Sequence, residues 1–459
     1  MVINPPNLRD AHLHFAEHGE ALEMVPLADC TGVDDCLMRL AAAASATPPG
    51  RWLRAKGARI EAWPERRYPT ASELDAAGNG RHVVVQSFDH HAMAVSTAVL
   101  KAVGLHPSTS DSPLPIHAHF IERDSRGHPT GVLLETACKL VWDAMPGPTS
   151  DDKRRHILAA QSDLLSVGFI EAHDMFSTAA LAEALLDLEA ADRLTLHLRL
   201  YATPEHLAAV EAVFDRRCNT GRTSPGGQIT LAGLKLFADG TLNSKTAAMF
   251  SPTDRGAQGV PPPGPLPRAG GVDTPHTGTL FFTTEQIARH IAGAAARNHQ
   301  TAVHAIGDAA VRQVLDAYEL AGRPRLPDLP RTPALRIEHA QFVDEADIPR
   351  FSAMNIIASL QPCHLLTDIE AIARNAPHRA DRAFPLRDLV DSAAAAGRDP
   401  AELVWLGSDS PVVRPDPADN LQAAVHRRRG SNDTPPVAPQ QAITREQCLA
   451  LHRAPAATL

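Results

Sequence analysis

From residue 151 onward the chain repeats one pattern of hydrophobic and polar positions. Short apolar runs, typical of buried strands, alternate with longer stretches in which apolar residues recur every three or four positions, as on one face of a helix. The apolar runs predict strands at residues 168–173, 194–201, 230–237, 301–305, 335–339, 356–360 and 404–407. The amphipathic stretches predict helices at residues 151–165, 178–191, 204–214, 284–298, 308–320 and 345–353, and a last helix from about residue 444.

One more strand is predicted near the N-terminus, around residues 10–15, and it brings the number of strands to eight. Strands that alternate with helices indicate an α/β fold with parallel strands, and eight such units are typical of a (β/α)8 TIM barrel. A doubly wound open sheet is the alternative. No Gly-x-Gly-x-x-Gly motif lies at a strand-to-helix turn, which favours the barrel.

Two segments interrupt the pattern. After a predicted Ala-rich helix at residues 33–44, residues 48–148 mix short apolar runs with Pro and Gly and show no sustained alternation. We therefore expect residues 1–459 to form a single barrel domain, with residues 48–148 as a subdomain inserted after the first strand that covers the active-site face. The Pro/Gly-rich stretch 251–279 predicts a mobile loop that closes over a substrate and excludes water.

The composition excludes several classes of protein. The 459-residue chain has 44 Lys and Arg against 53 Asp and Glu, a net charge of −9, which argues against a nucleic-acid partner. No apolar run approaches the roughly 20 residues of a spanning helix, and the first ten residues do not resemble a signal peptide. The six cysteines form no Cys-x-x-Cys pair. We expect a cytoplasmic protein with a small-molecule substrate and no membrane partner, and a homodimer stays open.

Residues suited to metal binding lie at the ends of the predicted strands. His12 and His14 are two positions apart, so both point to the same face of a strand and can reach one ion. Each later candidate has an ordinary structural explanation, such as a core histidine, a helix-capping aspartate or a lysine that extends to solvent. In a barrel, however, all of them lie at the same end of the strands, where active sites form. These later candidates are Lys235, Asp239, His304, His339 and Asp409.

Lys235 is the most informative of these residues. It lies within an otherwise apolar strand, where an unpaired ammonium group is costly to bury. Beside two metal ions its amine could react with CO2 and give a carbamate, whose two oxygen atoms would bridge the ions.

Six ordered motifs carry a resemblance to a known family, and they cover nearly the whole chain. They are Asp10-Ala11-His12-Leu13-His14, Phe237-Ala238-Asp239-Gly240-Thr241-Leu242-Asn243-Ser244, His304-Ala305-Ile306-Gly307-Asp308, Arg336-Ile337-Glu338-His339-Ala340-Gln341, Gln361-Pro362-Cys363-His364 and Gly407-Ser408-Asp409-Ser410-Pro411. Together they resemble the metal-dependent amidohydrolase superfamily. Within these motifs the amino-acid sequence is similar to that of its YtcJ-like branch, the amidohydrolase 3 group that includes N-substituted formamide deformylases.

The resemblance implies a set of site residues. The metal ligands would be His12, His14, Lys235 as a carbamate, His304, His339 and Asp409, and Asp409 would also be the proton shuttle. The family's usual metal is zinc, as one or two ions, with manganese or iron as alternatives. The substrate pocket would include His91, Asp239 and His364, and either the second metal ion or His91 would polarise the substrate carbonyl.

The sequence departs from the family pattern in two places. Relatives flank the barrel with a small β-sandwich built from both termini, whereas only nine residues precede Asp10 here, so we expect a barrel without the sandwich. The branch's Asp-Gly-His motif is matched by Asp89-His90-His91, with His90 in place of Gly. Ala94 and Ser96 follow where the branch has Trp and Asn. These changes affect the substrate side of the pocket.

The expected function is metal-dependent hydrolysis of a carbon–nitrogen bond in a non-peptide amide, such as an N-formyl or N-acyl compound. A metal-activated hydroxide would attack the carbonyl carbon, and Asp409 would transfer the proton to the leaving nitrogen. One alternative is a deaminase of a heterocyclic amine, a class that generally uses one metal without a bridging lysine. Another is a degenerate barrel without catalytic activity. The sequence leaves open the substrate and the number and identity of the metals.

Overall fold

The computed structural model describes residues 7–48, 50–88, 92–105, 120–218, 221–250, 278–430 and 435–455. The chain divides into two compact units. One comprises Met1–His18 and Ile157–Leu459 and is called the barrel unit; the other, Gly19–His156, is called the second unit. Residues 251–277 of the predicted mobile loop lie outside the described residues, so its closure over a substrate stays a prediction.

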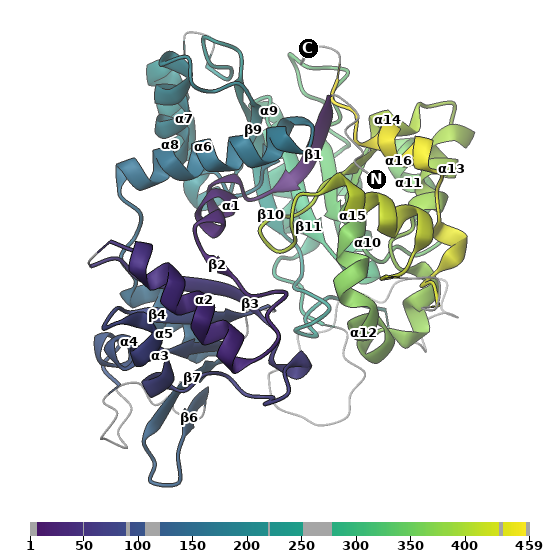
Figure 1. Cartoon of the computed structure of the whole chain (residues 1–459). Helices are drawn as coiled ribbons and strands as arrows, with labels where there is room; N and C mark the ends of the chain where they lie inside the picture. Colours follow the sequence, from purple (N-terminus) through teal and green to yellow (C-terminus); the bar gives the residue numbers. More distant parts are fainter. Residues whose placement is uncertain are drawn as a thin grey trace. The chain divides into compact units, whose positions relative to one another are not determined.

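A nearly closed sheet of eight parallel strands forms the centre of the barrel unit (Figure 1). The strands pair in chain order, and a parallel bridge between Leu13 and Ser410 brings the first strand to the segment that follows the last. The strands are β1 (Leu8–Leu13), β8 (Phe169–Asp174), β9 (His197–Ala202), β10 (Ile229–Phe237), β11 (Gln300–Ala305), β12 (Leu335–His339), β13 (Ile357–Leu360) and β14 (Val404–Leu406). The predicted α/β class and the eight strands in barrel order are confirmed.

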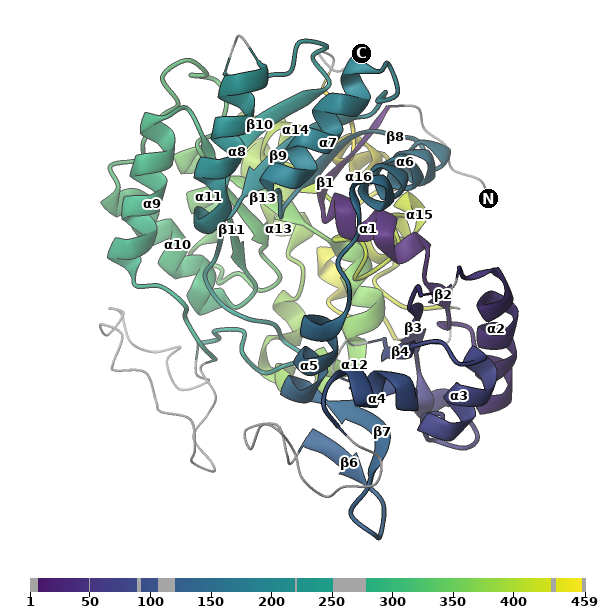
Figure 2. The same cartoon turned by 90° about the vertical axis from the view of Figure 1, so that its left-hand side faces the viewer.

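Helices connect the strands and lie outside the sheet, as Figure 2 shows for α7 to α10. The principal ones are α1 (Phe15–Leu22), α6 (Ser150–Ser166), α7 (Ala179–Ala190), α8 (Pro204–Arg217), α9 (Thr284–Ala296), α10 (Asp308–Leu320), α11 (Ile348–Met354), α12 (Leu365–Asn375), α13 (Leu386–Ala395), α14 (Pro400–Leu403), α15 (Pro417–Leu421) and α16 (Arg445–Leu451). The last predicted helix, from about residue 444 onward, corresponds to α16, which already ends at Leu451.

Local sequence explains how such a helix forms. Helix α9 begins with a capping box, in which the Thr283 side chain accepts from the Gln286 backbone N–H and the Gln286 side chain accepts from the Thr283 N–H. One face then buries Ile287 and Ile291 in the main hydrophobic core, and the helix packs on β11. The periodic apolar positions therefore bury one face against the sheet.

The strands are buried on both faces, but the two faces differ. All five positions of β12 are buried. Leu335 and Ile337 belong to the main hydrophobic core, while Arg336 and Glu338 alternate with them and must point to the other side of the strand, into the ring. Charged residues inside a barrel need partners, so this alternation marks the interior as a candidate site.

The second unit has its own mixed sheet and its own hydrophobic core. Its strands pair in the order β2 (Val25–Pro26), β3 (Leu53–Ala58), β4 (Val83–Ser87), β5 (Ala92–Val95), β7 (Pro129–Leu134) and β6 (Ile121–Arg123). Its helices are α2 (Val33–Ala46), α3 (Ala71–Gly78), α4 (Thr97–Ala102) and α5 (Cys138–Ala144). At residues 19–156 the second unit extends beyond both ends of the expected insertion at residues 48–148. That it covers the active-site face stays a prediction.

Among the described residues, no helix combines the length and the apolar character needed to cross a membrane. All six cysteines are buried.

Candidate metal centre

Three buried side chains from distant parts of the chain meet at the carboxyl ends of the barrel strands. His12 lies on β1, His339 ends β12, and Asp409 follows β14. One ligand atom of each residue lies within 4.8 Å of the others. His12 Nε2 is 3.4 Å from Asp409 Oδ1, and the ring centroids of His12 and His339 are 4.8 Å apart. This spacing allows one cation to contact all three.

Further predicted residues surround these three. His14 Nε2 lies 3.2 Å from Asp409 Oδ1, and the His304 ring centroid lies 4.5 Å from that of His339. His304 Nε2 is also 3.1 Å from the Gly240 carbonyl oxygen. The structure therefore brings together His12, His14, His304, His339 and Asp409.

Lys235 is completely buried on β10, where its Nζ lies 5.0 Å from the centroid of the Phe237 ring. Burial lowers the pKa of its amine to about 8, although the charges of Glu338 and Asp409 act in the opposite direction. Among the described residues, Lys235 Nζ has no hydrogen-bond partner. A buried polar atom without a partner is costly, which indicates a ligand.

Electrostatics set the protonation of the cluster. Burial lowers the pKa of His304 to about 3 and that of His339 well below its usual value. Burial alone would raise the pKa of Asp409, but the neighbouring His12 and His14 hold it well below its ordinary range. At neutral pH these positions therefore offer two neutral imidazoles and a carboxylate, the forms in which such side chains bind a divalent cation.

A buried carboxylate orients His12. Glu338 Oε2 accepts a hydrogen bond of 2.6 Å from His12 Nδ1, which leaves the lone pair of Nε2 directed away from Glu338. Glu338 is in turn paired with Arg336, whose Nη2 lies 3.0 Å from the same oxygen. Although burial opposes its charge, Arg336 and His12 hold the pKa of Glu338 well below its usual value.

The backbone at two of these positions is strained. His339 has φ 69° and Asp409 has φ 62°, both in the left-handed region that residues other than glycine rarely adopt. Hydrogen bonds hold the Asp409 segment against β1, since Asp409 N donates to His12 O at 2.7 Å and Ser408 N donates to Asp10 Oδ1 at 3.0 Å. Strain of this kind commonly occurs at functional sites.

The three residues predicted to bind substrate differ in their surroundings. Asp239 Oδ2 accepts from the N–H groups of Ala248 and Gly307, each at 2.9 Å, so the structure shows it joining two loops. Burial raises the pKa of Asp239 to about 7. His364 is near the cluster, with Nε2 3.6 Å from Asp409 Oδ2. His91 lies outside the described residues, and the substrate roles of all three stay predictions.

The residues that support the ligands were not predicted from the sequence. Arg336 Nη1 donates to His173 Nδ1 at 2.7 Å, and His173 Nε2 lies 2.8 Å from Glu171 Oε1. With Glu338 they form a buried line of polar side chains through the barrel. The available signal was the alternation of charged and apolar residues on β8 and β12, because a charge in a strand that is otherwise buried indicates an internal partner.

The chain is similar to known proteins over nearly its whole length. The model of the amidohydrolase family matches residues 6–459. YtcJ of Bacillus subtilis (strain 168) is 27% identical over 451 residues, which cover 98% of this chain and 77% of that protein. The N-substituted formamide deformylase of Arthrobacter pascens is 25% identical over 460 residues, covering 97% of this chain and 77% of that protein.

Two solved structures are similar over most of the chain. The structure of a metal-dependent hydrolase from Pyrococcus furiosus is 26% identical with a TM-score of 0.69, and covers 97% of this chain and 80% of its own. The structure of a metal-dependent hydrolase from Pyrococcus horikoshii OT3 is 25% identical with a TM-score of 0.66, and the match covers 92% of this chain and 74% of that chain. Because the family model matches almost every residue and the barrel holds a buried cluster suited to a metal ion, this chain belongs to the amidohydrolase family and is a hydrolase.

Proposed function

We propose that this protein hydrolyses a carbon–nitrogen bond in a non-peptide amide, of the N-formyl or N-acyl class, with the help of bound zinc. The residues that would hold one or two ions are His12, His14, Lys235, His304, His339 and Asp409. Imidazole nitrogens with carboxylate oxygens suit zinc, and manganese or iron are alternatives. The relative from Arthrobacter pascens is named for the removal of a formyl group from N-substituted formamides, which motivates the substrate class.

One observation carries the proposal. Ligand atoms of His12, His339 and Asp409 lie within 4.8 Å of one another, and all three side chains are buried. Because burial keeps His339 neutral while Asp409 is ionised, the cluster offers imidazole nitrogen and carboxylate oxygen in the forms that bind a divalent cation.

A bound zinc ion supplies two effects, because it polarises a carbonyl group and lowers the pKa of coordinated water to about 7. Asp409 is proposed to accept the proton of the attacking water and to deliver it to the leaving nitrogen, so that an amine rather than an amide anion departs. Glu338 keeps His12 in one tautomer throughout. His364, whose Nε2 lies 3.6 Å from Asp409 Oδ2, is proposed to bind the substrate, and His91 is proposed to polarise the carbonyl.

Lys235 is proposed to be carbamylated. In that reaction the neutral amine, which the ammonium gives by losing one proton, bonds through Nζ to the carbon of CO2 and loses a second proton. A buried cation is thereby replaced by an anion that would help to hold metal ions. The burial of Nζ and its lack of a hydrogen-bond partner among the described residues support this assignment, and so does an amine pKa of about 8. A cytoplasmic location and a homodimeric state stay predictions from the sequence.

The test combines metal analysis with a substrate screen. The purified protein, with added zinc or manganese, is assayed on N-formyl, N-acyl, cyclic imide and ester compounds. We expect release of amine and formate or carboxylic acid, and an Asp409→Asn variant that is about 10²–10⁴-fold slower. Asp419→Asn, which removes a carboxylate paired with Arg414, is the matched control and should keep full activity.

Two results would contradict the proposal. A protein that holds no metal and cannot be reconstituted would exclude metal-dependent hydrolysis. Ammonia release from heterocyclic amines, with no turnover of amides, would instead indicate a deaminase.

A further inference from the structure

A cavity of about 1150 Å³ lies at the other end of the barrel from the metal centre. Its lining includes Arg9 near the start of β1, Arg199 in the first half of β9, Ala334 just before β12 and Asn355 before β13. The metal-centre residues lie at or beyond the opposite ends of their strands. The cavity therefore opens at the amino-terminal mouth of the barrel, away from the site described above.

The cavity is strongly positive in a protein that is negative as a whole. Its lining holds seven arginines and three carboxylates, whereas the whole chain has a net charge of −9. Arg199 is paired with Glu171 at 3.1 Å, and Arg398 with Glu402 at 3.1 Å. Four arginines have no carboxylate within ion-pair distance among the described residues: Arg9, Arg325, Arg331 and Arg453. Like charges gathered around one cavity repel each other, which an anion between them would offset.

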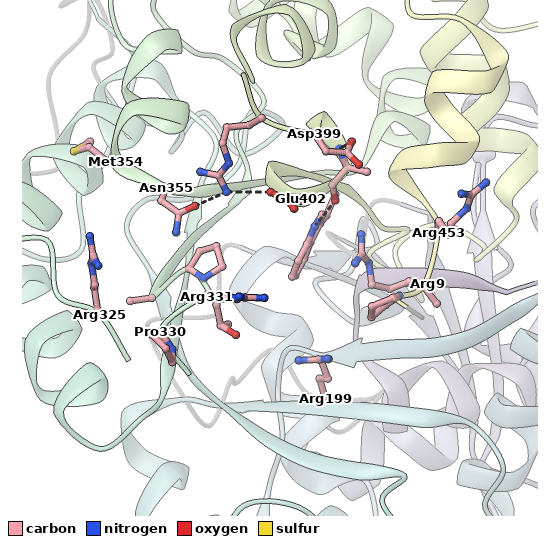
Figure 3. A pocket seen from close by; sticks show the side chains of 18 of the residues that line it. Arg9, Arg199, Arg325, Pro330, Arg331, Met354, Asn355, Asp399, Glu402 and Arg453 are labelled. Atoms are coloured by element: carbon pink, nitrogen blue, oxygen red, sulfur yellow. Dashed lines mark hydrogen bonds and ion pairs between the residues drawn. The ribbon is translucent and has the colours of Figure 1, made fainter. Parts of the chain in front are cut away.

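The surroundings of Arg9 distinguish the lining of the cavity from a group of solvated surface residues. Its side chain is only 4% exposed, and its guanidinium stacks on the Trp405 ring with 4.1 Å between Cζ and the ring centroid. Nη2 donates to the Leu451 carbonyl at 3.3 Å, while Nε is buried without a partner among the described residues. Burial lowers the pKa of Arg9 to about 9, so its charge is poorly compensated. Figure 3 shows the guanidinium groups of Arg9, Arg199 and Arg331 around the same part of the cavity.

We propose that this cavity binds a small polyanion that carries phosphate or carboxylate groups. Planar guanidinium groups match the oxygen atoms of both groups in pairs, and arginine is the residue best suited to such recognition. Trp405 adds an aromatic surface that also holds Arg9 in place. The volume of about 1150 Å³ is slightly above the roughly 300–1,000 Å³ common for small-molecule sites, so the cavity has room for such a ligand. This site is separate from the metal centre, and its ligand need not be the substrate.

The test is direct binding to the full chain, measured by isothermal titration calorimetry at constant ionic strength set with sodium chloride. Inorganic phosphate and succinate are the probes, and they distinguish a phosphate site from a dicarboxylate site. We expect saturable binding of at least one. The triple variant Arg325→Gln, Arg331→Gln, Arg453→Gln should bind about tenfold or more weakly, since it removes three charge contacts.

The matched control is Arg289→Gln, which removes an exposed arginine of α9 that does not line the cavity. It should bind as the wild type does. Far-ultraviolet circular dichroism checks that each variant is folded, and because the three replaced arginines are exposed, the fold should persist. The proposal is overturned if neither probe binds saturably to the wild type, or if the triple variant binds as tightly as the control.

Discussion

Replacement of Glu338 by Gln tests how the barrel interior supports the metal centre. The Glu338 carboxylate is fully buried between Arg336 Nη2 at 3.0 Å and His12 Nδ1 at 2.6 Å. Glutamine keeps the shape and one acceptor oxygen but removes the negative charge. Among the described residues, Arg336 has no other carboxylate within ion-pair distance, so the variant leaves a buried cation unpaired.

The structure gives the size of the effect. Two unit charges 3.0 Å apart attract each other by roughly 5.5 kcal/mol at an effective dielectric constant of about 20. Removal of one partner from a buried pair costs about 3–5 kcal/mol in proteins. We therefore expect the free energy of unfolding of the barrel unit to fall by about 3–5 kcal/mol. The affinity for zinc should also fall about 10- to 100-fold, because His12 loses the group that fixes its tautomer.

Urea unfolding followed by tryptophan fluorescence measures the free energy of unfolding, since Trp405 lies 5.2 Å from the Arg336 guanidinium. Competition with a zinc-binding dye measures the affinity for zinc. Glu345→Gln is the matched control, because the Glu345 side chain is 82% exposed and faces Arg382 at 3.5 Å. It should change stability by no more than about 0.5 kcal/mol. Equal unfolding midpoints for the two variants would refute the reasoning.

Three further predictions concern other parts of the barrel unit. Lys235→Ala should lose bound metal and activity, and short carboxylic acids such as formate or acetate should restore part of both if Lys235 is carbamylated; metal content and turnover measured with and without the acid check this. Gly233→Ala should destabilise the sheet by about 1–3 kcal/mol or more in urea unfolding, because a Cβ would lie 1.8 Å from the Gln300 carbonyl oxygen of the neighbouring strand. Acid should destabilise the His452→Gln variant less than it destabilises the wild type. Burial lowers the pKa of His452 from 6.5 to about 4, so the stability that the neutral imidazole contributes is complete above pH 6.5 and is lost as the pH falls towards 4. Unfolding at pH 4.5 and 7 should show the wild type losing up to about 3 kcal/mol more than the variant, and equal losses would contradict the assignment.

The hydrophobic pattern predicts most of the barrel because its strands are short and apolar and its helices bury one face. Residues 308–320 and 335–339 are predicted with the same bounds that α10 and β12 have in the structure. Helices α12 and α13 are missing from the prediction. Pro362, Pro377 and Pro385 divide that region into pieces too short to show a clear period.

The candidate site was predictable only in part, because sequence order gives strand ends but not contacts between side chains. The meeting of His12, His339 and Asp409 follows from the barrel geometry. The hydrogen bond from His12 to Glu338 joins residues 326 positions apart, and neither residue reveals its partner in the sequence. The motif of Asp239 predicts a substrate role, which stays a prediction, but it does not reveal that the carboxylate accepts from the backbone of two loops.

The distribution of partners inside the barrel supports both proposed sites by one physical argument. A buried charge is stable when it is paired, and Arg336 meets this condition through Glu338 and through the Ser359 hydroxyl at 3.0 Å. Among the described residues, Lys235 Nζ and Arg9 Nε have no hydrogen-bond partner. Lys235 belongs to the metal centre, and Arg9 lines the arginine-rich cavity at the opposite mouth. The cost of a poorly compensated buried cation is therefore removed at one end of the barrel by the proposed carbamate and offset at the other by the proposed anion.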